Sequence, residues 1–148
     1  MREKGLIAET EMIVRVVLSL LFGGLIGLER ELDKEAAGLR THMLVCLGAT
    51  LFTIISFSFP AAEPERIASN IVVGIGFLGA GAIFKDSNKV KGLTTAADMW
   101  VIAAVGMAIG FGYYSMAVVA TVLVLAILVV KKVITDMKNR STLGKRLI

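Results

Sequence analysis

The stretch IASNIVVGIGFLGAGAIF, from Ile67 to Phe84, contains glycines with the spacing of a dinucleotide-binding loop, G-x-G-x-x-G at Gly74, Gly76 and Gly79. Such a loop requires a strand before it and a helix that opens at its glycines, so that backbone amides meet the pyrophosphate. Here the glycines lie inside one apolar run without a preceding strand or turn signal. The stretch instead predicts a membrane-spanning helix, in which small residues let neighbouring helices approach closely.

The composition of the whole chain also indicates a membrane protein. Of its 148 residues, 56% are hydrophobic and 19% are charged, and the mean hydropathy is +0.80. Soluble domains have about 45 to 50% apolar and about 25% charged residues. The single cysteine, Cys46, lies in an apolar segment and cannot form a disulfide within one chain. The polar N-terminus lacks the apolar region of a signal peptide, so we expect the first span to direct insertion itself.

Five apolar segments are long enough, or nearly so, to cross the membrane, which takes about 20 helical residues. No linker rich in proline or serine separates them. We therefore predict an all-α fold, a bundle of about five transmembrane helices over residues 12–131, with a polar N-terminal tail at 1–11 and a basic cytoplasmic tail at 132–148. The spans are predicted at Thr10–Leu28, Thr41–Phe59, Ile67–Phe84, Leu93–Gly110 and Tyr114–Val130.

The basic residues predict the orientation of this bundle. They gather in the first and third connections and in the C-terminal tail, whereas the second connection has only Arg66 and the fourth has none. Connections rich in lysine and arginine stay in the cytoplasm, so the N-terminus is expected outside and the C-terminus inside. Because these residues border apolar spans and are not interleaved with exposed aromatics, we expect no nucleic-acid partner.

The two halves of the chain resemble each other at an offset of 54 positions. A true repeat of two helices would relate the halves by a pseudo-twofold axis along the membrane normal. Coincidence in a chain rich in glycine and leucine is the alternative. The matching pairs are Gly27 with Gly81, Gly38 with Gly92, Leu39 with Leu93, Thr41 with Thr95, and Ala49 with Ala103.

Four sequence blocks, between about Val14 and Leu125, resemble a known family. They read GGLIGLERE, AGLRTHMLVCLGATLF, ERIASNIVVGIGFLGAGAIF and VKGLTTAADMW. In this order they are similar to the membrane domain of the MgtC/SapB family of bacterial inner-membrane proteins. The resemblance implies a multi-pass protein of the bacterial cytoplasmic membrane that acts in magnesium homeostasis and in acid or stress adaptation. Many members also carry a C-terminal domain resembling the ACT fold, which we expect this chain to lack.

Ionisable side chains at membrane depth cost about 2.5 to 3.5 kcal/mol on insertion scales and therefore suggest function. Arg15 and Asp98 are such residues. Their spans enter the membrane from opposite sides, so we expect them near opposite faces, with Asp98 close to Arg30 or Arg40. Arg15 is expected either to extend towards the outer interface or to approach Asn70. The family resemblance would place a small or neutral residue where the chain has Asp98.

Polar residues are expected to form a vestibule at the cytoplasmic face. Its carboxylates could hold a transient Mg²⁺, although no metal-ligand spacing occurs. Two helix starts, Gly-Leu-Arg-Thr and Gly-Leu-Thr-Thr, could instead attract an anion. The only histidine is either a proton relay or a capping residue. The vestibule residues are Glu29, Arg30, Arg40, Thr41, His42, Asp86, Thr94, Thr95 and Asp98.

Glycines on three predicted helices are expected to form helix-packing faces. Since five small spans enclose little volume, we expect a homodimer that forms through one of these faces. The glycines are Gly23 and Gly27 on the first helix, Gly74, Gly76, Gly79 and Gly81 on the third, and Gly106 and Gly110 on the fourth.

Two functions remain open at this point. The vestibule could sense or handle a cation or proton, or the glycine-rich helices could dock onto another membrane complex, such as the ATP synthase, without transport. The polar groups concentrate in the cytoplasmic half, which favours sensing or docking over conduction. We expect no enzymatic activity, because the sequence has neither a Ser-His-Asp set nor a metal-binding His-Glu-x-x-His helix, and we expect no resident cofactor.

Overall fold

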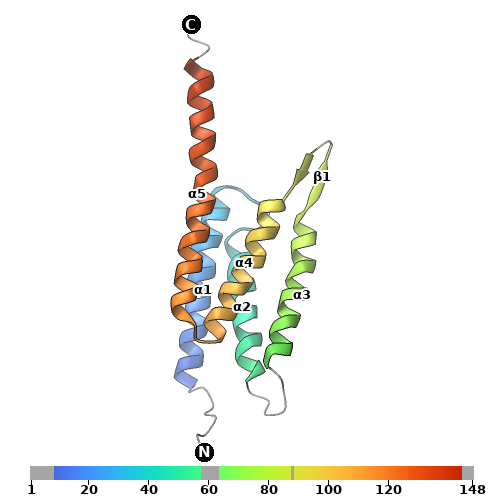
Figure 1. Ribbon diagram of the computed structural model, residues 1–148, viewed down its shortest axis with the longest axis vertical. Coiled ribbons are helices and arrows are strands. Elements are labelled where there is room, and N and C mark those ends of the chain that lie inside the picture. The colour runs from blue at the N-terminus through green and yellow to red at the C-terminus, as the bar shows by residue number, and fades with distance from the viewer. Residues whose placement is uncertain (1–8, 58–63, 88, 145–148) are drawn as a thin grey trace, which may run out of the picture.

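The computed structural model describes residues 9–57, 64–87 and 89–144, with the backbone alone at 64, 65 and 131–144. The described residues form five helices and one hairpin (Figure 1). The predicted all-α membrane bundle is confirmed, whereas the hairpin between α3 and α4 was not predicted. The elements are α1 (Glu9–Leu32), α2 (Leu39–Ser56), α3 (Pro64–Ala82), β1 (Phe84–Asp86), β2 (Lys89–Lys91), α4 (Leu93–Gly110) and α5 (Tyr114–Gly144).

The apolar content of the helices explains why they form in a membrane. Helices satisfy their backbone hydrogen bonds internally, as hydrocarbon requires. Three of them, α1, α2 and α4, are long and apolar enough to cross a bilayer, and residues 66–82 and 114–130 form shorter apolar helices. The backbone of α5 continues as a helix to Gly144, beyond the span expected to end at Val130.

Successive helices run in opposite directions, and α2 packs against both α1 and α4 (Figure 1). In contrast, α3 packs mainly against α4. The α1–α2 connection, the β1–β2 hairpin and the far part of α5 lie towards one end, which we call the basic end (Figure 1). The arrangement therefore brings the basic connections of the sequence to the same end of the bundle.

Glycines on α1 and α4 allow both helices to lie directly on α2. A Cβ atom at Gly23 would lie 2.8 Å from the carbonyl oxygen of His42, and one at Gly110 would lie 2.5 Å from Cβ of Thr53. Gly27 and Gly106 also lie too close to the backbone of α2 for a side chain. Close backbone contact of this kind is a main source of helix association in lipid, where the hydrophobic effect adds little.

The glycines of α3 lie differently. A Cβ atom at Gly74, Gly76 or Gly81 would meet nothing within 4 Å, and one at Gly79 would make ordinary contact with Ala96 at 3.6 Å. The expectation that all four glycines pack closely within one bundle is therefore wrong for Gly74, Gly76 and Gly81. Gly74 lines an apolar groove between α2 and α3, and Gly76 and Gly81 are exposed. Packing through these three stays a prediction for contacts with another chain.

The possible repeat is visible in α2 and α4 but not in the whole of each half. Both α2 and α4 have 18 residues, and they begin at Leu39 and Leu93, at the offset found in the sequence. The preceding helices differ in length, since α1 has 24 residues and α3 has 19. The glycines before α2 and α4 also differ in conformation, since Gly38 is extended and Gly92 is left-handed with φ of 85°.

The packing on α2 predicts that Gly106→Ala lowers the free energy of unfolding by about 1 to 3 kcal/mol, the usual range for an overpacked core. The added methyl group would press against the carbonyl of Cys46. Gly76→Ala is the matched control, expected to be neutral or to stabilise the helix by up to about 1 kcal/mol. Unfolding in detergent micelles, followed by circular dichroism, measures both. Equal destabilisation would contradict the packing described.

Candidate functional site

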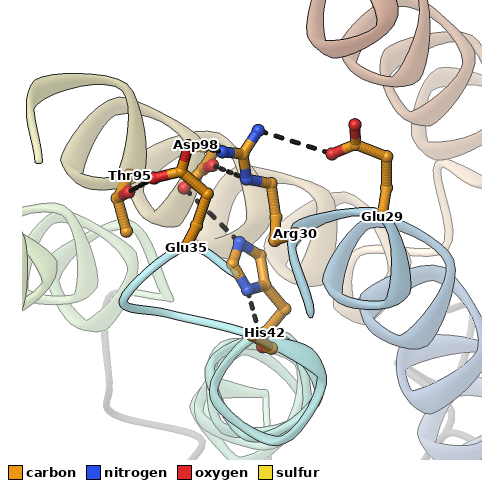
Figure 2. A network of polar contacts seen from close by, with 7 residues as sticks. Glu29, Arg30, Glu35, His42, Thr95 and Asp98 are labelled. Atoms are coloured by element: carbon orange, nitrogen blue, oxygen red, sulfur yellow. Dashed lines mark hydrogen bonds and ion pairs between the residues drawn. The ribbon is translucent and has the colours of Figure 1, made fainter. Parts of the chain in front are cut away.

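Six side chains form an ionic cluster inside the bundle near its basic end (Figure 2). At its centre is Arg30, which is completely buried. Its Nε lies 3.2 Å from Oδ2 of Asp98, and its two Nη atoms lie 2.8 Å from Oε1 of Glu35 and 3.4 Å from Oε2 of Glu29. One guanidinium therefore meets three carboxylates. The ionic cluster consists of Glu29, Arg30, Glu35, His42, Thr95 and Asp98.

The ends of three helices position these side chains. Arg30 belongs to the last turn of α1, where the partial negative charge of the helix end favours a cation. Asp98 is one and a half turns into α4, and His42 is in the first turn of α2. Thr95, in the first turn of α4, donates a hydrogen bond to Oε2 of Glu35 at 3.3 Å. Glu35 lies in the α1–α2 connection, so the cluster joins α1, α2 and α4.

Carboxylates of the chain itself meet the two helix starts that could, as an alternative, have attracted an external anion. Oε2 of Glu31 accepts a hydrogen bond from the backbone N–H of Leu39, the first residue of α2, at 3.0 Å. Gly38 leaves room for this carboxylate, and a Cβ atom there would require the Glu31 side chain to move. Glu35 takes the corresponding place beside Thr95 at the start of α4. The positive ends of these helices are thus already matched by negative charge.

The structure brings together only part of the expected vestibule. It gathers Glu29, Arg30, His42, Thr95 and Asp98, and Asp98 meets the first of its two expected partners. The alternative partner, Arg40, is exposed on α2. Among the remaining residues, Thr41 is half-buried, Thr94 is exposed, and Asp86 is exposed and pairs with Lys91 in the hairpin at 2.5 Å.

Sequence reasoning missed Glu35. It lies in the stretch ERELDKEAAG, which carries both acidic and basic residues and whose path across the end of the bundle cannot be read from hydropathy. No sequence signal distinguished it from the other carboxylates of this stretch. In the structure the connection turns back over α4, and Glu35 is held by both Arg30 and Thr95.

The cluster does not have the geometry of a metal site. Within the described residues, no three His, Cys, Asp or Glu side chains are grouped so that they could hold a metal ion. Glu29, Glu35 and Asp98 are each directed at Arg30 instead of at a common point. A transient, hydrated Mg²⁺ near the mouth of the cluster stays a prediction, whereas a dehydrated site does not fit these donors.

At the opposite end of the bundle, Arg15 connects α1 with the α4–α5 connection. Its Nη1 donates to the carbonyl oxygen of Gly110 at 2.5 Å, its Nε donates to Oη of Tyr114 at 3.2 Å, and it forms an ion pair with Glu11. The alternative approach to Asn70 is not made, since Asn70 is exposed on α3. Arg15 thereby satisfies a carbonyl at the C-terminal end of α4, which is a structural role.

Between these two ends the interior is apolar. Its buried side chains include Ile26, Cys46, Ile102, Val105 and Ile109. Buried hydroxyl groups also occur, but each donates its proton to a backbone carbonyl. Among the described residues, no Asp, Glu, Lys, Arg or His lies in a span between the ionic cluster and Arg15. The hydroxyl groups are those of Ser19, Thr50, Thr53, Ser56 and Thr121.

This fold and this ionic cluster define a multi-pass helical membrane protein with a buried ionic cluster at one end and a buried arginine, Arg15, at the other. Residues 16–137 match the model of the MgtC family, and the chain belongs to that family. The membrane-domain resemblance inferred from the four sequence blocks is confirmed.

Several curated proteins are similar to the chain. It is 42% identical over 127 residues to YhiD of Escherichia coli K12, named "Putative magnesium transporter YhiD", covering 80% of this chain and 59% of that protein. It is 50% identical over 110 residues to Protein MgtC of Brucella abortus strain 2308, covering 74% and 46%. For Protein MgtC of Salmonella typhimurium LT2, the identity is 43% over 113 residues, covering 76% and 49%. The chain thus spans about half the length of these relatives. No solved structure matches it.

The ionic cluster predicts that Arg30→Gln lowers the free energy of unfolding by about 3 to 5 kcal/mol, since the change leaves buried carboxylates without their cation. Arg40→Gln removes the same charge from an exposed position on α2 and is expected to change stability by less than about 0.5 kcal/mol. Unfolding in detergent micelles compares the two variants. An Arg30→Gln protein as stable as Arg40→Gln would show that the cluster does not hold the helices together.

Proposed function

We propose that this protein is a regulatory component of magnesium homeostasis, and of adaptation to acid or stress, in the bacterial inner membrane. In this proposal it senses a proton or cation at the ionic cluster without conducting it and without catalysis. The membership of the MgtC family and the name of YhiD support the link with magnesium. The chain covers 59% of YhiD, so the activity of that whole protein is carried over only as part of this proposal.

The observation that carries the proposal is the one-sided placement of the ionic cluster. Carriers place their substrate and ion sites near the middle of the membrane, where both sides can reach them alternately. Here the ionic cluster lies at the basic end, and the layer around Ile26, Ile102 and Ile109 separates it from Arg15, which is buried at the opposite end. Such an interior favours binding from one side over passage between the two.

A cleft at the basic end gives the cluster an opening. It encloses about 600 Å³ and is lined by both charged and polar side chains. Glu35 and Thr95 line this cleft and also belong to the ionic cluster, while Lys34 and Lys91 stand at its wall. Because basic connections stay in the cytoplasm, we expect the cleft to open to the cytoplasm.

A second function is favoured by the outward face of α3. Gly76 and Gly81 leave this face open, and Phe77 and Val73 beside them are 84% and 74% exposed. Small residues next to large apolar ones allow another helix to approach closely in lipid. This face could receive a second copy of the chain, giving the expected homodimer, or a helix of another membrane complex such as the ATP synthase.

Liposomes with purified protein test the absence of conduction. We expect no flux of Mg²⁺ or protons above that of empty liposomes, because the interior lacks a polar route. Asp98→Asn removes the buried carboxylate, and Asp86→Asn removes an exposed one at the same end as a control. A flux that wild type and Asp86→Asn show and Asp98→Asn loses would establish a pathway. In that case the sensing proposal would be wrong.

The single tryptophan can report on sensing. Trp100 follows Asp98 by two positions on α4 and is half exposed. If the ionic cluster binds a proton or cation, the fluorescence of Trp100 in nanodiscs is expected to change with pH or Mg²⁺ concentration in wild type and in Asp86→Asn, but not in Asp98→Asn. A wild-type fluorescence that changes with neither pH nor Mg²⁺ concentration would favour docking. Docking is then tested by a pull-down from membranes, in which Gly76→Leu is expected to recover less of a partner than wild type.

A further inference from the structure

We propose that His42 and Asp98 together bind one proton, held between Nε2 of His42 and Oδ1 of Asp98. This inference rests on the proposed function and deepens it, because it names the ligand of the ionic cluster. Figure 2 shows the imidazole ring of His42 placed between its own helix and Asp98 of α4, so that each ring nitrogen has a separate neighbour.

The first ring nitrogen has a fixed role. Nδ1 of His42 lies 2.9 Å from the carbonyl oxygen of Gly38, one turn earlier in the chain. A carbonyl oxygen can only accept a hydrogen bond, so Nδ1 carries a hydrogen and donates it. The neutral ring then has its lone pair on Nε2.

The second ring nitrogen faces a carboxylate. Nε2 of His42 lies 3.4 Å from Oδ1 of Asp98, and the side chains are 0% and 4% exposed. Within the described residues, neither atom makes a hydrogen bond to another group. Without a proton, the lone pair of a neutral ring would face a negatively charged oxygen in a buried site, which is unfavourable. One proton placed between the atoms turns this repulsion into an ion pair.

The charged groups around the pair are arranged about Asp98 and Arg30. Oδ1 of Asp98, from α4, faces the ring, and Arg30 of α1 contacts the other oxygen of the same carboxylate. Glu29 of α1 and Glu35 of the α1–α2 connection contact Arg30. The negative charge that faces Nε2 of His42 is therefore Oδ1 of Asp98, and one proton between these two atoms gives them a hydrogen bond.

A proton fits this position better than a metal ion. No group of three or more metal-ligating side chains occurs within the described residues. The guanidinium of Arg30 lies 3.2 Å from Oδ2 of Asp98. A metal ion bound to the Asp98 carboxylate would therefore lie beside a positive charge, which is unfavourable. A proton needs only the two facing atoms.

The bound proton would also connect helix packing with pH. His42 belongs to α2 and Asp98 to α4, so the pair joins the basic ends of these helices, while Arg30 joins α1 to the same carboxylate. Loss of the proton removes the attraction between α2 and α4 at this end and leaves the Arg30 contact in place. The cleft is lined by Glu35 and Thr95, and Glu35 contacts Arg30, which binds the same Asp98 carboxylate.

Nuclear magnetic resonance can test the site directly, because His42 is the only histidine. The protein, purified through a tag without histidine and labelled with ¹⁵N at histidine and ¹³C at aspartate, is placed in lipid nanodiscs. At neutral pH we expect hydrogens on both ring nitrogens of His42, or on Nδ1 together with a protonated carboxyl group at Asp98. In Asp98→Asn the second hydrogen is expected to be lost at neutral pH, whereas Asp86→Asn should match wild type.

A wild-type ring with a hydrogen on Nδ1 alone, beside an ionised Asp98, would overturn the proposal at once. So would a titration of His42 that is the same in wild type and in a folded Asp98→Asn protein. If Asp98→Asn does not fold, the wild-type spectra decide by themselves. The nuclear magnetic resonance test can also fail while the liposomes show no flux and the fluorescence of Trp100 changes with Mg²⁺. That combination would exclude the proton as the ligand and leave the sensing proposal intact. Conduction through the liposome membrane would overturn the proposed function alone.

Discussion

A guanidinium buried in a membrane protein has to be neutralised where it lies, and this requirement organises the basic end of the bundle. Arg30 is fully buried, and desolvating such an ion costs several kcal/mol unless carboxylates and further hydrogen bonds compensate. Those carboxylates come from α1, from the α1–α2 connection and from α4. The position of Arg30 therefore determines where the first connection crosses the bundle and how α4 is rotated.

The glycines make this arrangement possible. Because α1 and α4 both lie against the backbone of α2 at Gly23, Gly27, Gly106 and Gly110, the side chains at their basic ends are within reach of one another. A larger residue at these positions would separate the helices, and the contacts of Arg30 and His42 with Asp98 would be lost. Close packing and charge compensation thus support each other, one along the helices and the other at their ends.

Hydropathy predicts the number of helices and the position of their apolar parts, because a run of about 20 apolar residues is typical of a membrane-spanning helix. It did not predict that α5 continues to Gly144. The alternating direction of successive spans was also enough to predict that Asp98 lies near Arg30. The rotation of each helix about its axis could not be predicted, since it depends on packing. Arg40, Thr41 and His42 are successive residues about 100° apart on α2, and only His42 faces inward. The exposure of the glycines of α3 was not predicted for the same reason. The position of Glu35 was not predicted because it depends on the path of the α1–α2 connection.

The continuation of α5 past the bundle gives the molecule a stiff projection (Figure 1). At about 1.5 Å per residue, the helical backbone of residues 131–144 rises about 20 Å beyond Val130. Because these residues continue the same helix as the apolar part of α5, a tilt of that part displaces their far end in proportion to this length.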